Sequence, residues 1–437
     1  MLKKLPLLLL LGSTTCFSVA QPPAPVRLSP DEAVRIALEN NFDIRIVRGD
    51  AEVARLNNTK ANAGMLPTVN LVAGDNIGLN AFQQQHLADG RVIEAYGRLN
   101  NNLNAGVQLN WTLFDGGRMQ ITKKRLQEME ALGQTDLRNA VQQTAAAVLL
   151  SYYGIVRSRL QERSTEELIA LNDERRRIAE ARLAAGFAAQ TDALQARIDL
   201  NQQRSNLLAL QTETAAAKRN LNRLLARAAD TAFDVEENLA ASYVPDAARL
   251  REQMLVQNPL IASLQKNAEI AALLVQENQK LNKPRITGVG QFTAQRTDNG
   301  AGFLLNNTQA GMVVGATLSL PLYTGGNIQR QVDVARVTAG QAAARLDAQR
   351  LNAETELQNQ LAFFQTQKQV LALEEENVKN ARESLNVSTE RFRLGQTNAL
   401  EVQSAQNTLE QALLRQNLVL YNLKTAELQL RLLAGAL

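Results

Sequence analysis

The sequence predicts a mixed α+β protein made of two tandem repeats, each with amphipathic strands and one very long helix. Gly186 recurs as Gly395, 209 positions later, and neighbouring motifs share this offset. Two tracts, 68–244 and 322–437, contain no proline, so they can hold very long helices. Several short segments alternate strictly between apolar and polar side chains, as half-buried strands do. Self-similarity at a fixed offset indicates a duplicated architecture.

Residues 1–20 are predicted to be a secretory signal peptide. Lys3 and Lys4 precede an apolar run, and small residues form a cleavage site at its end. The sequence before Cys16 lacks the usual spacing of a lipidation site, although lipidation there stays open. Removing the two lysines lowers the formal net charge from +4 to +2, which excludes the basic footprint of a nucleic-acid-binding protein.

The rest of the composition argues against an enzyme. After cleavage no cysteine remains, and His86 is the single histidine in the sequence. Disulfides, thiolate metal sites and nucleophile–histidine pairs are therefore excluded, and we expect no catalytic residue, metal or cofactor. No later segment has about 18 consecutive apolar residues, so we expect no transmembrane helix. Insertion into a membrane would require strands.

Residues 107–113 predict a strand with one apolar and one polar face. Partner strands are expected near 69–79 and 286–294. Apolar-out, polar-in alternation is what an outer-membrane barrel requires, although the edge of a soluble sandwich is an alternative. The matching run in the second copy places five apolar residues on one face: Val314, Ala316, Leu318, Leu320 and Leu322. Four aromatic residues are candidates for the membrane interface: Trp111, Phe114, Phe292 and Tyr323.

The two strand pairs are predicted at 67–115 and 285–323. Four strands are too few for a transmembrane barrel, since known barrels have eight or more. Three chains would supply twelve strands, so we expect an oligomer. Polar segments 75–105 and 295–308 are predicted to be outer loops.

The long helices are predicted at 117–185 and 327–393, where alanine, leucine, glutamine, arginine and glutamate dominate. Each would be about 100 Å long. Gly186 and Gly395 follow them as helix-ending residues. Returning helices follow at 190–228 and 398–434, so that each repeat forms a helical hairpin. Thr191, Asp192, Thr397 and Asn398 are the candidates for their N-caps.

Two shorter leading helices are predicted at 29–63 and 247–282. A leading and a returning helix stacked end to end would match one long helix. The chain divides into a first repeat, an equatorial linker and a second repeat, at 21–230, 231–245 and 246–437. In the leading helices the offset is 217, as between Asn41 and Asn258, which places eight additional residues in the first outer loop. The charge runs 175–177 and 374–376 are interpreted as solvated or lumen-facing helix sides rather than as metal or nucleotide sites.

Several motifs together resemble the TolC family of outer-membrane efflux ducts. The segments WTLFDGG (111–117) and LPLYTGG (320–326) each close a strand and open a helix. The segments RLAAGFAAQTDALQA (182–196) and RFRLGQTNALEVQSA (391–405) match the family's helical turns. Their order and duplication carry the resemblance across the mature chain. The strand-to-helix junction residues are Gly116, Gly117, Pro321, Gly325 and Gly326.

The resemblance implies a homotrimer with a twelve-stranded barrel in the outer membrane and a twelve-helix tunnel through the periplasm. Such a duct passively conducts cargo in a tripartite efflux or type I secretion system. Its partners would be outer-membrane lipid, a periplasmic adaptor and an inner-membrane pump. The alternative is a periplasmic adaptor, but adaptors have one helical hairpin and a lipoyl-like domain, whereas this sequence predicts two hairpins and two strand pairs.

The resemblance also implies site residues at the periplasmic tip. The turns that meet the adaptor correspond to Arg182, Leu183, Gly186, Arg391, Leu394 and Gly395. The pore constriction corresponds to Asp192, Glu401 and Ser404, where Ser404 replaces an acid of the family pattern. In the family, the acid matching Asp192 locks the closed tip with a tyrosine and an arginine. Phe392 and Thr397 stand at those positions, so another contact must hold the tip, and Arg182, Arg391 and Arg393 are candidates.

Overall fold

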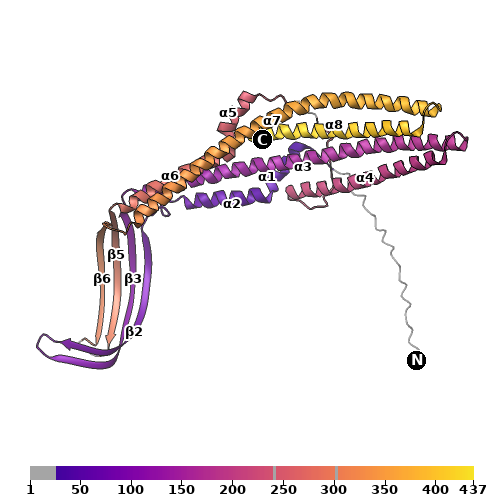
Figure 1. Cartoon of the computed structure of the whole chain (residues 1–437). Helices are drawn as coiled ribbons and strands as arrows, with labels where there is room; N and C mark the ends of the chain where they lie inside the picture. Colours follow the sequence, from indigo (N-terminus) through magenta and orange to yellow (C-terminus); the bar gives the residue numbers. More distant parts are fainter. Residues whose placement is uncertain (1–25, 240–242, 301–303) are drawn as a thin grey trace, which may run out of the picture.

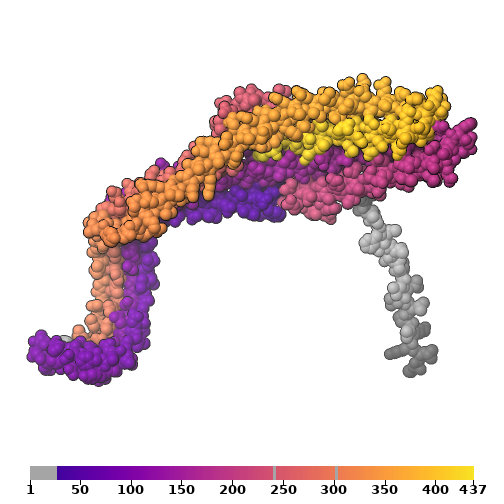
Figure 2. All heavy atoms as spheres, viewed as in Figure 1, coloured from indigo at the N-terminus to yellow at the C-terminus, as the bar shows by residue number. Residues whose placement is uncertain are grey.

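The computed structural model describes residues 26–239, 243–300 and 304–437, so the predicted signal peptide and Cys16 lie outside the described residues. The described chain is long and bent (Figure 1). A narrow sheet forms one arm, and a body of long helices forms the other. The space-filling view shows the sheet arm projecting from one end of the helical body (Figure 2).

The sheet arm is a four-stranded antiparallel sheet in the order β2-β3-β5-β6. Strands β2 and β6 are the edges, and each is hydrogen-bonded on one side within the described chain. The sheet is therefore open. The strand bounds are Thr68–His86 for β2, Val92–Phe114 for β3, Arg285–Asn299 for β5 and Asn306–Ser319 for β6.

The predicted loops at 75–105 and 295–308 are wrong for most of their length, because the strands continue through them. Asparagine, glutamine and glycine disfavour strands on their own, but a continuous antiparallel ladder overrides that preference. Strand β5 ends opposite Asn100, whereas β2 and β3 pair onward to the His86–Val92 pair. This two-stranded extension, residues 79–86 with 92–99, is called the ribbon and lies at the far end of the sheet (Figure 1).

The strand register confirms the predicted alternation. Leu71, Val107, Phe292 and Met312 are aligned across the four strands on one face. Leu71 is 78% exposed and Met312 is 73% exposed, so this apolar face is uncovered within one chain. The next row, on the opposite face, consists of Asn70, Gln108, Gln291 and Val313.

Two details of the strand predictions are wrong. Strand β6 ends at Ser319, so Leu320 and Leu322 lie beyond the ladder. Phe292 lies in the middle of β5 rather than at a strand end, whereas Trp111 lies near the helical end of β3. The indole nitrogen of Trp111 donates a hydrogen bond to the carbonyl of Met65 (3.0 Å).

The long helices are α3 and α7, and each returns through a turn into a shorter helix, α4 or α8. Both long helices have 67 residues and both returning helices have 35, so the duplication is preserved in structure. Helices α2 and α4 both run along α3, one toward the sheet and one toward the tip (Figure 1). The bounds are Arg118–Ala184 for α3, Gln190–Leu224 for α4, Asn327–Arg393 for α7 and Ala399–Leu433 for α8.

Each leading helix, predicted as continuous, is broken by one asparagine. Asn41 separates α1 from α2, and Asn258 separates α5 from α6. Pro259 was a signal for the second break, because proline disfavours a helix interior, whereas no proline marks the break at Asn41. The bounds are Pro30–Asn40 for α1, Phe42–Asn57 for α2, Ala247–Gln257 for α5 and Pro259–Gln279 for α6, followed by a short 3₁₀ turn, η1, at Lys280–Asn282.

The two asparagines make the same contacts in both repeats. The Asn41 carboxamide oxygen accepts the amide hydrogens of Asp43 and Ile44, and its nitrogen donates to the carbonyl of Leu224 (2.9 Å). Asn258 caps α6 in the same way and donates to the carbonyl of Leu433 (3.0 Å). Each side chain thus joins the start of one helix to the last residue of another.

The predicted linker at 231–245 contains a strand, β4 (Phe233–Val235), which pairs in parallel with β1 (Val26–Leu28). The buried Tyr152 hydroxyl holds this pair against α3. It donates to the carbonyl of Leu28 (2.8 Å) and accepts from the backbone nitrogen of Glu236 (2.9 Å). Burial raises the pKa of Tyr152 to about 12, so the donating proton stays in place at neutral pH.

Each repeat has a small core where its leading, long and returning helices meet. The first includes Ala37, Val148, Tyr152 and Leu221. Another cluster lies toward the tip, joins the two hairpins and includes Phe392. The corresponding core of the second repeat contains Met254, Leu357, Phe364 and Leu430. None of the helices in the described ranges has the length and apolarity that crossing a membrane requires.

We expect Asn41→Ala to loosen the junction of α1, α2 and α4. The substitution removes an N-cap and leaves the Leu224 carbonyl without its donor, which costs about 1–3 kcal/mol. Hydrogen exchange followed by mass spectrometry should show protection at the start of α2 falling about tenfold or more. Asn40→Ala is the control, because Asn40 is exposed and donates only within α1. Equal effects of both substitutions would contradict the assignment.

Candidate functional site

The two turns at the tip end their long helices in the same way. The backbone nitrogen of Phe187 donates to the carbonyl of Arg182 (2.8 Å), and that of Gly186 donates to Leu183 (3.0 Å). The second turn repeats this pattern around Gly395. This is the Schellman motif, in which a residue with positive φ satisfies the last helical carbonyls. Gly186 and Gly395 have φ of 79° and 78°, values that a side chain would disfavour.

The starts of the returning helices differ. Asn398 caps α8, since its side chain accepts the amide hydrogen of Glu401 (3.0 Å), as predicted. In the first repeat the N-cap is Ala189, which has no capping side chain, and Thr191 and Asp192 lie inside α4. The predicted cap there is therefore wrong by two to three residues.

Arg182 joins the two hairpins at the tip. Its guanidinium donates to the carbonyl of Phe392 (2.7 Å) and lies over the Phe392 ring, 4.7 Å from the centroid. Phe392 is 1% exposed, so the ring fills the core while its carbonyl receives the charge-assisted bond. The phenylalanine that replaces the family's tyrosine is thus held through its backbone and its ring face rather than through a hydroxyl.

The other two candidate arginines differ in reach. Arg393 bonds Glu174 on the first hairpin (2.9 Å), so it also crosses between hairpins. Arg391 bonds Glu401 (2.7 Å) within its own hairpin. The Thr397 hydroxyl also donates to the Glu401 carboxylate. Arg391 and Thr397 therefore both bind this one acid.

The three predicted constriction residues are not brought together within one chain. Glu401 is engaged as above, and Ser404 is exposed on α8. The Asp192 side chain makes no hydrogen bond or ion pair with the described residues; it lines a cavity of about 310 Å³ between α4 and α8, as does Arg175.

A buried polar network below the tip was missed. Arg175 is 3% exposed and donates to Gln406 on α8 (2.7 Å) and to Asp199 on α4. Asp199 also accepts from Gln403 (3.0 Å). Arg175 stands in a run of three arginines, for which the sequence predicts a solvated or lumen-facing helix side. That interpretation is wrong for Arg175, because the first arginine of the run points between the hairpins.

The run 374–376 is also split, because Glu374 is buried and bonds Arg415 (3.1 Å). The spacing of residues along α3 could have indicated that Arg175 is buried. Arg175 falls on the same stripe of α3 as the buried Leu168 and Asn172.

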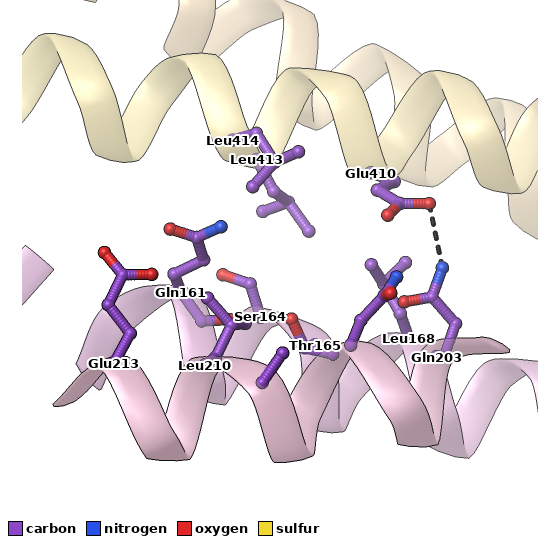
Figure 3. Close-up of a pocket in the computed structure, with 12 residues that line it drawn as sticks. Gln161, Ser164, Thr165, Leu168, Gln203, Leu210, Glu213, Glu410, Leu413 and Leu414 are labelled. Atoms are coloured by element: carbon purple, nitrogen blue, oxygen red, sulfur yellow. Dashed lines mark hydrogen bonds between the residues drawn. The ribbon is translucent and has the colours of Figure 1, made fainter. Parts of the chain in front are cut away.

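The space between the hairpins continues toward the equator as a groove. A cavity of about 320 Å³ is lined from α3 and α4 on one side and from α8 on the other (Figure 3). Gln203 donates to Glu410 across it (3.0 Å), as the dashed line in Figure 3 shows. Leu168 and Leu413 also face it, so the groove is half apolar and offers no concentrated charge.

At the tip, several carboxylates are held ionised by arginine. Hydrogen bonding from Arg197, with a further contribution from Arg176, lowers the pKa of Glu180. Hydrogen bonding from Arg176 likewise lowers the pKa of Asp173. Both carboxylates are partly exposed, so solvent screens these contacts and the effect on stability is small. Among the described residues, no cluster of histidine, cysteine, aspartate and glutamate has the arrangement of a metal site.

In each repeat a pair of glycines lies between a strand and the long helix that follows it. Gly116 and Gly117 precede α3, and Gly325 and Gly326 precede α7, all with positive φ. A Cβ at Gly116 would lie 2.2 Å from the Lys283 Cβ, so the junction needs glycine for space as well as for conformation. Pro321 follows β6 and lies before the second glycine pair. Both Asp115 carboxylate oxygens accept the amide hydrogen of Met119, capping α3.

Comparison with known proteins agrees with this architecture. The family model "Outer membrane efflux protein" matches residues 33–227 and 250–436. The outer membrane efflux protein BepC of Brucella suis is 23% identical over 305 residues, which cover 70% of this chain and 66% of BepC, just under two thirds of its length. The cobalt-zinc-cadmium resistance protein CzcC of Cupriavidus metallidurans is 23% identical over 365 residues, covering 79% of this chain and 84% of CzcC.

Among solved structures, the outer membrane protein VceC of Vibrio cholerae superimposes with a TM-score of 0.80 at 17% identity, covering 93% of this chain and 96% of VceC. The family match spans both repeats, and the structural match extends from sheet to tip. The chain therefore belongs to the outer membrane efflux protein family, and it has the fold of that family's outer-membrane exit channels.

Proposed function

We propose that three copies of this chain form a passive exit duct that receives cargo from a periplasmic adaptor and an inner-membrane pump of a tripartite efflux system. The observation that carries the proposal is the open sheet. Within the described part of the chain, edges β2 and β6 each have a free side, and nothing covers the apolar face. Open strand edges do not occur in lipid, so the sheet must be closed by further copies. Three copies supply twelve strands.

The helical body supports the same assembly. Large apolar side chains are exposed on α4 and α7, including Leu208 (66%), Leu351 (68%) and Leu373 (61%). Soluble monomers rarely leave such surfaces open, so these positions are expected to contact the next copy. The adaptor alternative is disfavoured because this chain has two hairpins and four long strands.

The tip contacts suggest how the duct stays closed. Arg182 and Arg393 tie the second hairpin to the first, where the family's tyrosine and arginine are absent. The turn residues Leu183, Gly186, Leu394 and Gly395 would then present the adaptor-binding surface. In a trimer, three copies of Glu401 would stand around the axis, while Asp192 and Ser404 would lie at the same level.

The mature protein in mild detergent should have three times the mass of one chain. Light scattering combined with refractive-index detection separates the mass of the protein from that of bound detergent. A monomer or dimer would exclude the twelve-stranded barrel.

Arg182→Ala should open the tip. Losing the charge-assisted bond and the ring contact weakens the closed form by about 2 kcal/mol, which corresponds to about thirtyfold in the open–closed equilibrium. Single-channel recordings in planar bilayers should show larger or more frequent openings. Arg204→Ala is the matched control, since Arg204 lies on exposed α4 surface and makes no side-chain bond to the described residues. Unchanged recordings for Arg182→Ala would show that Arg182 does not hold the tip closed.

Glu401→Gln should lower the preference of the channel for cations, because it removes three carboxylates and releases three Arg391 side chains. The reversal potential in a salt gradient measures this preference. Glu383→Gln removes the same charge from exposed α7 surface and should leave the potential unchanged. Equal potentials for all three proteins would leave Glu401 with a capping role alone.

A further inference from the structure

A polar cavity of about 380 Å³ lies where the sheet meets the helical body. Its wall is formed by the first turns of α3, the end of α6, the segment 62–64 and the bases of β3 and β5. Strands β3 and β5 are the inner strands of the sheet. The cavity therefore lies mainly at the bases of the two inner strands, and one chain supplies all of the lining residues named above.

Three arginines face this cavity, and their charges are not fully balanced. Arg125 bonds the carboxylate of Glu277 closely (2.8 Å), whereas Arg118 reaches the same carboxylate at 3.5 Å and is 44% exposed. Arg285 donates to the Thr112 hydroxyl (3.1 Å) and forms no ion pair with the described residues.

The acids at the cavity are already engaged. Glu277 is 5% exposed and is held by two guanidinium groups. Asp115 accepts the amide hydrogen at the start of α3 with both oxygens. Arg118 and Arg285 thus keep free hydrogen-bond donors that face the cavity. The three arginines of its wall outnumber the two acids by one positive charge. Planar guanidinium groups suit carboxylate and phosphate oxygens, which they bind in pairs of hydrogen bonds.

The strand register shows on which face of the sheet this cavity lies. Thr112 has the same strand parity as Gln108, and Arg285 the same as Gln291, so both belong to the polar face of the sheet. That face is also lined by amide side chains farther along the strands. In the closed trimer the polar face would line the water-filled pore.

We propose that this cavity binds the phosphate or carboxylate group of water-borne anions as they pass from the helical body into the strand-lined pore, with Arg118 and Arg285 as the binding residues. The proposal rests on the proposed duct, because closure of the trimer makes the polar face a lumen. Glu277 is a positioning residue that holds Arg125 and orients Arg118. The site would give anionic cargo a binding step where the tunnel meets the barrel.

The first test needs no conduction. Phenylglyoxal, an arginine-selective reagent, is applied to the detergent-solubilised full chain in phosphate or in chloride at equal ionic strength. Modification is read by mass spectrometry. Phosphate should slow modification of Arg118 and Arg285 but not of Arg296, which lies on β5 on the opposite face. Equal rates in both salts would overturn the proposal, as would protection that requires anionic phospholipid instead of inorganic phosphate.

The second test measures function in bilayers of neutral phosphatidylcholine. Phosphate should reduce the potassium chloride current, and Arg118→Gln with Arg285→Gln should raise the half-blocking concentration about tenfold or more. Arg296→Gln, which removes one positive charge from the opposite face of the sheet, should block like the unchanged protein. The Lys double variant keeps the charge and should retain part of the block, which guards against misfolding of the Gln variant. Equal block in all proteins would overturn the site, whereas absence of any conductance would count against the duct and leave the protection test decisive.

Discussion

One asparagine in each repeat, at the break in the leading helix, makes the contacts on which the rest of the architecture depends. Asn41 and Asn258 each cap one helix and bind the last carbonyl of another. Both are nearly buried, so a carboxamide with a donor and an acceptor is required there. The contact fixes where the returning helix ends against the leading helix, so the two shorter helices run alongside one long helix, one toward the sheet and one toward the tip. The places of the hairpins and of the sheet along the long helices follow from this contact.

A second constraint is the modest core of the helical body. Many buried positions are alanine, such as Ala193, Ala196 and Ala405, which allow close approach but bury little apolar area. Polar contacts therefore carry much of the specificity between hairpins. Arg175, buried between α4 and α8, and Arg182, stacked on Phe392, set the register of one hairpin against the other. The buried charge of Arg175 depends on complete partnering, and Gln406 and Asp199 supply the acceptors.

Much of this fold could be predicted from sequence, because the strongest patterns are long. Proline-free tracts and paired glycines placed the long helices and their turns, and strict alternation at 107–113 gave the correct face of β3. The failures are local. Pro259 could have indicated the break at Asn258, whereas no proline marks the break at Asn41. Segment 75–105 is rich in asparagine, glutamine and glycine, but a continuous ladder holds most of it in strands. For the site, the turn glycines followed from their spacing, whereas the buried role of Arg175 and the cavity at Arg285 depend on contacts between distant segments.

The ribbon has a consequence for symmetry. Because the two repeats are alike from the tip to the base of the sheet, three copies would present six nearly equivalent hairpins toward the pump. At the other end the equivalence stops, since β2 and β3 extend past the last residue of β5 while the second strand pair does not. The duct would thus change from nearly sixfold at its periplasmic end to threefold at its outer rim, where three ribbons would project beyond the shorter strands β5 and β6.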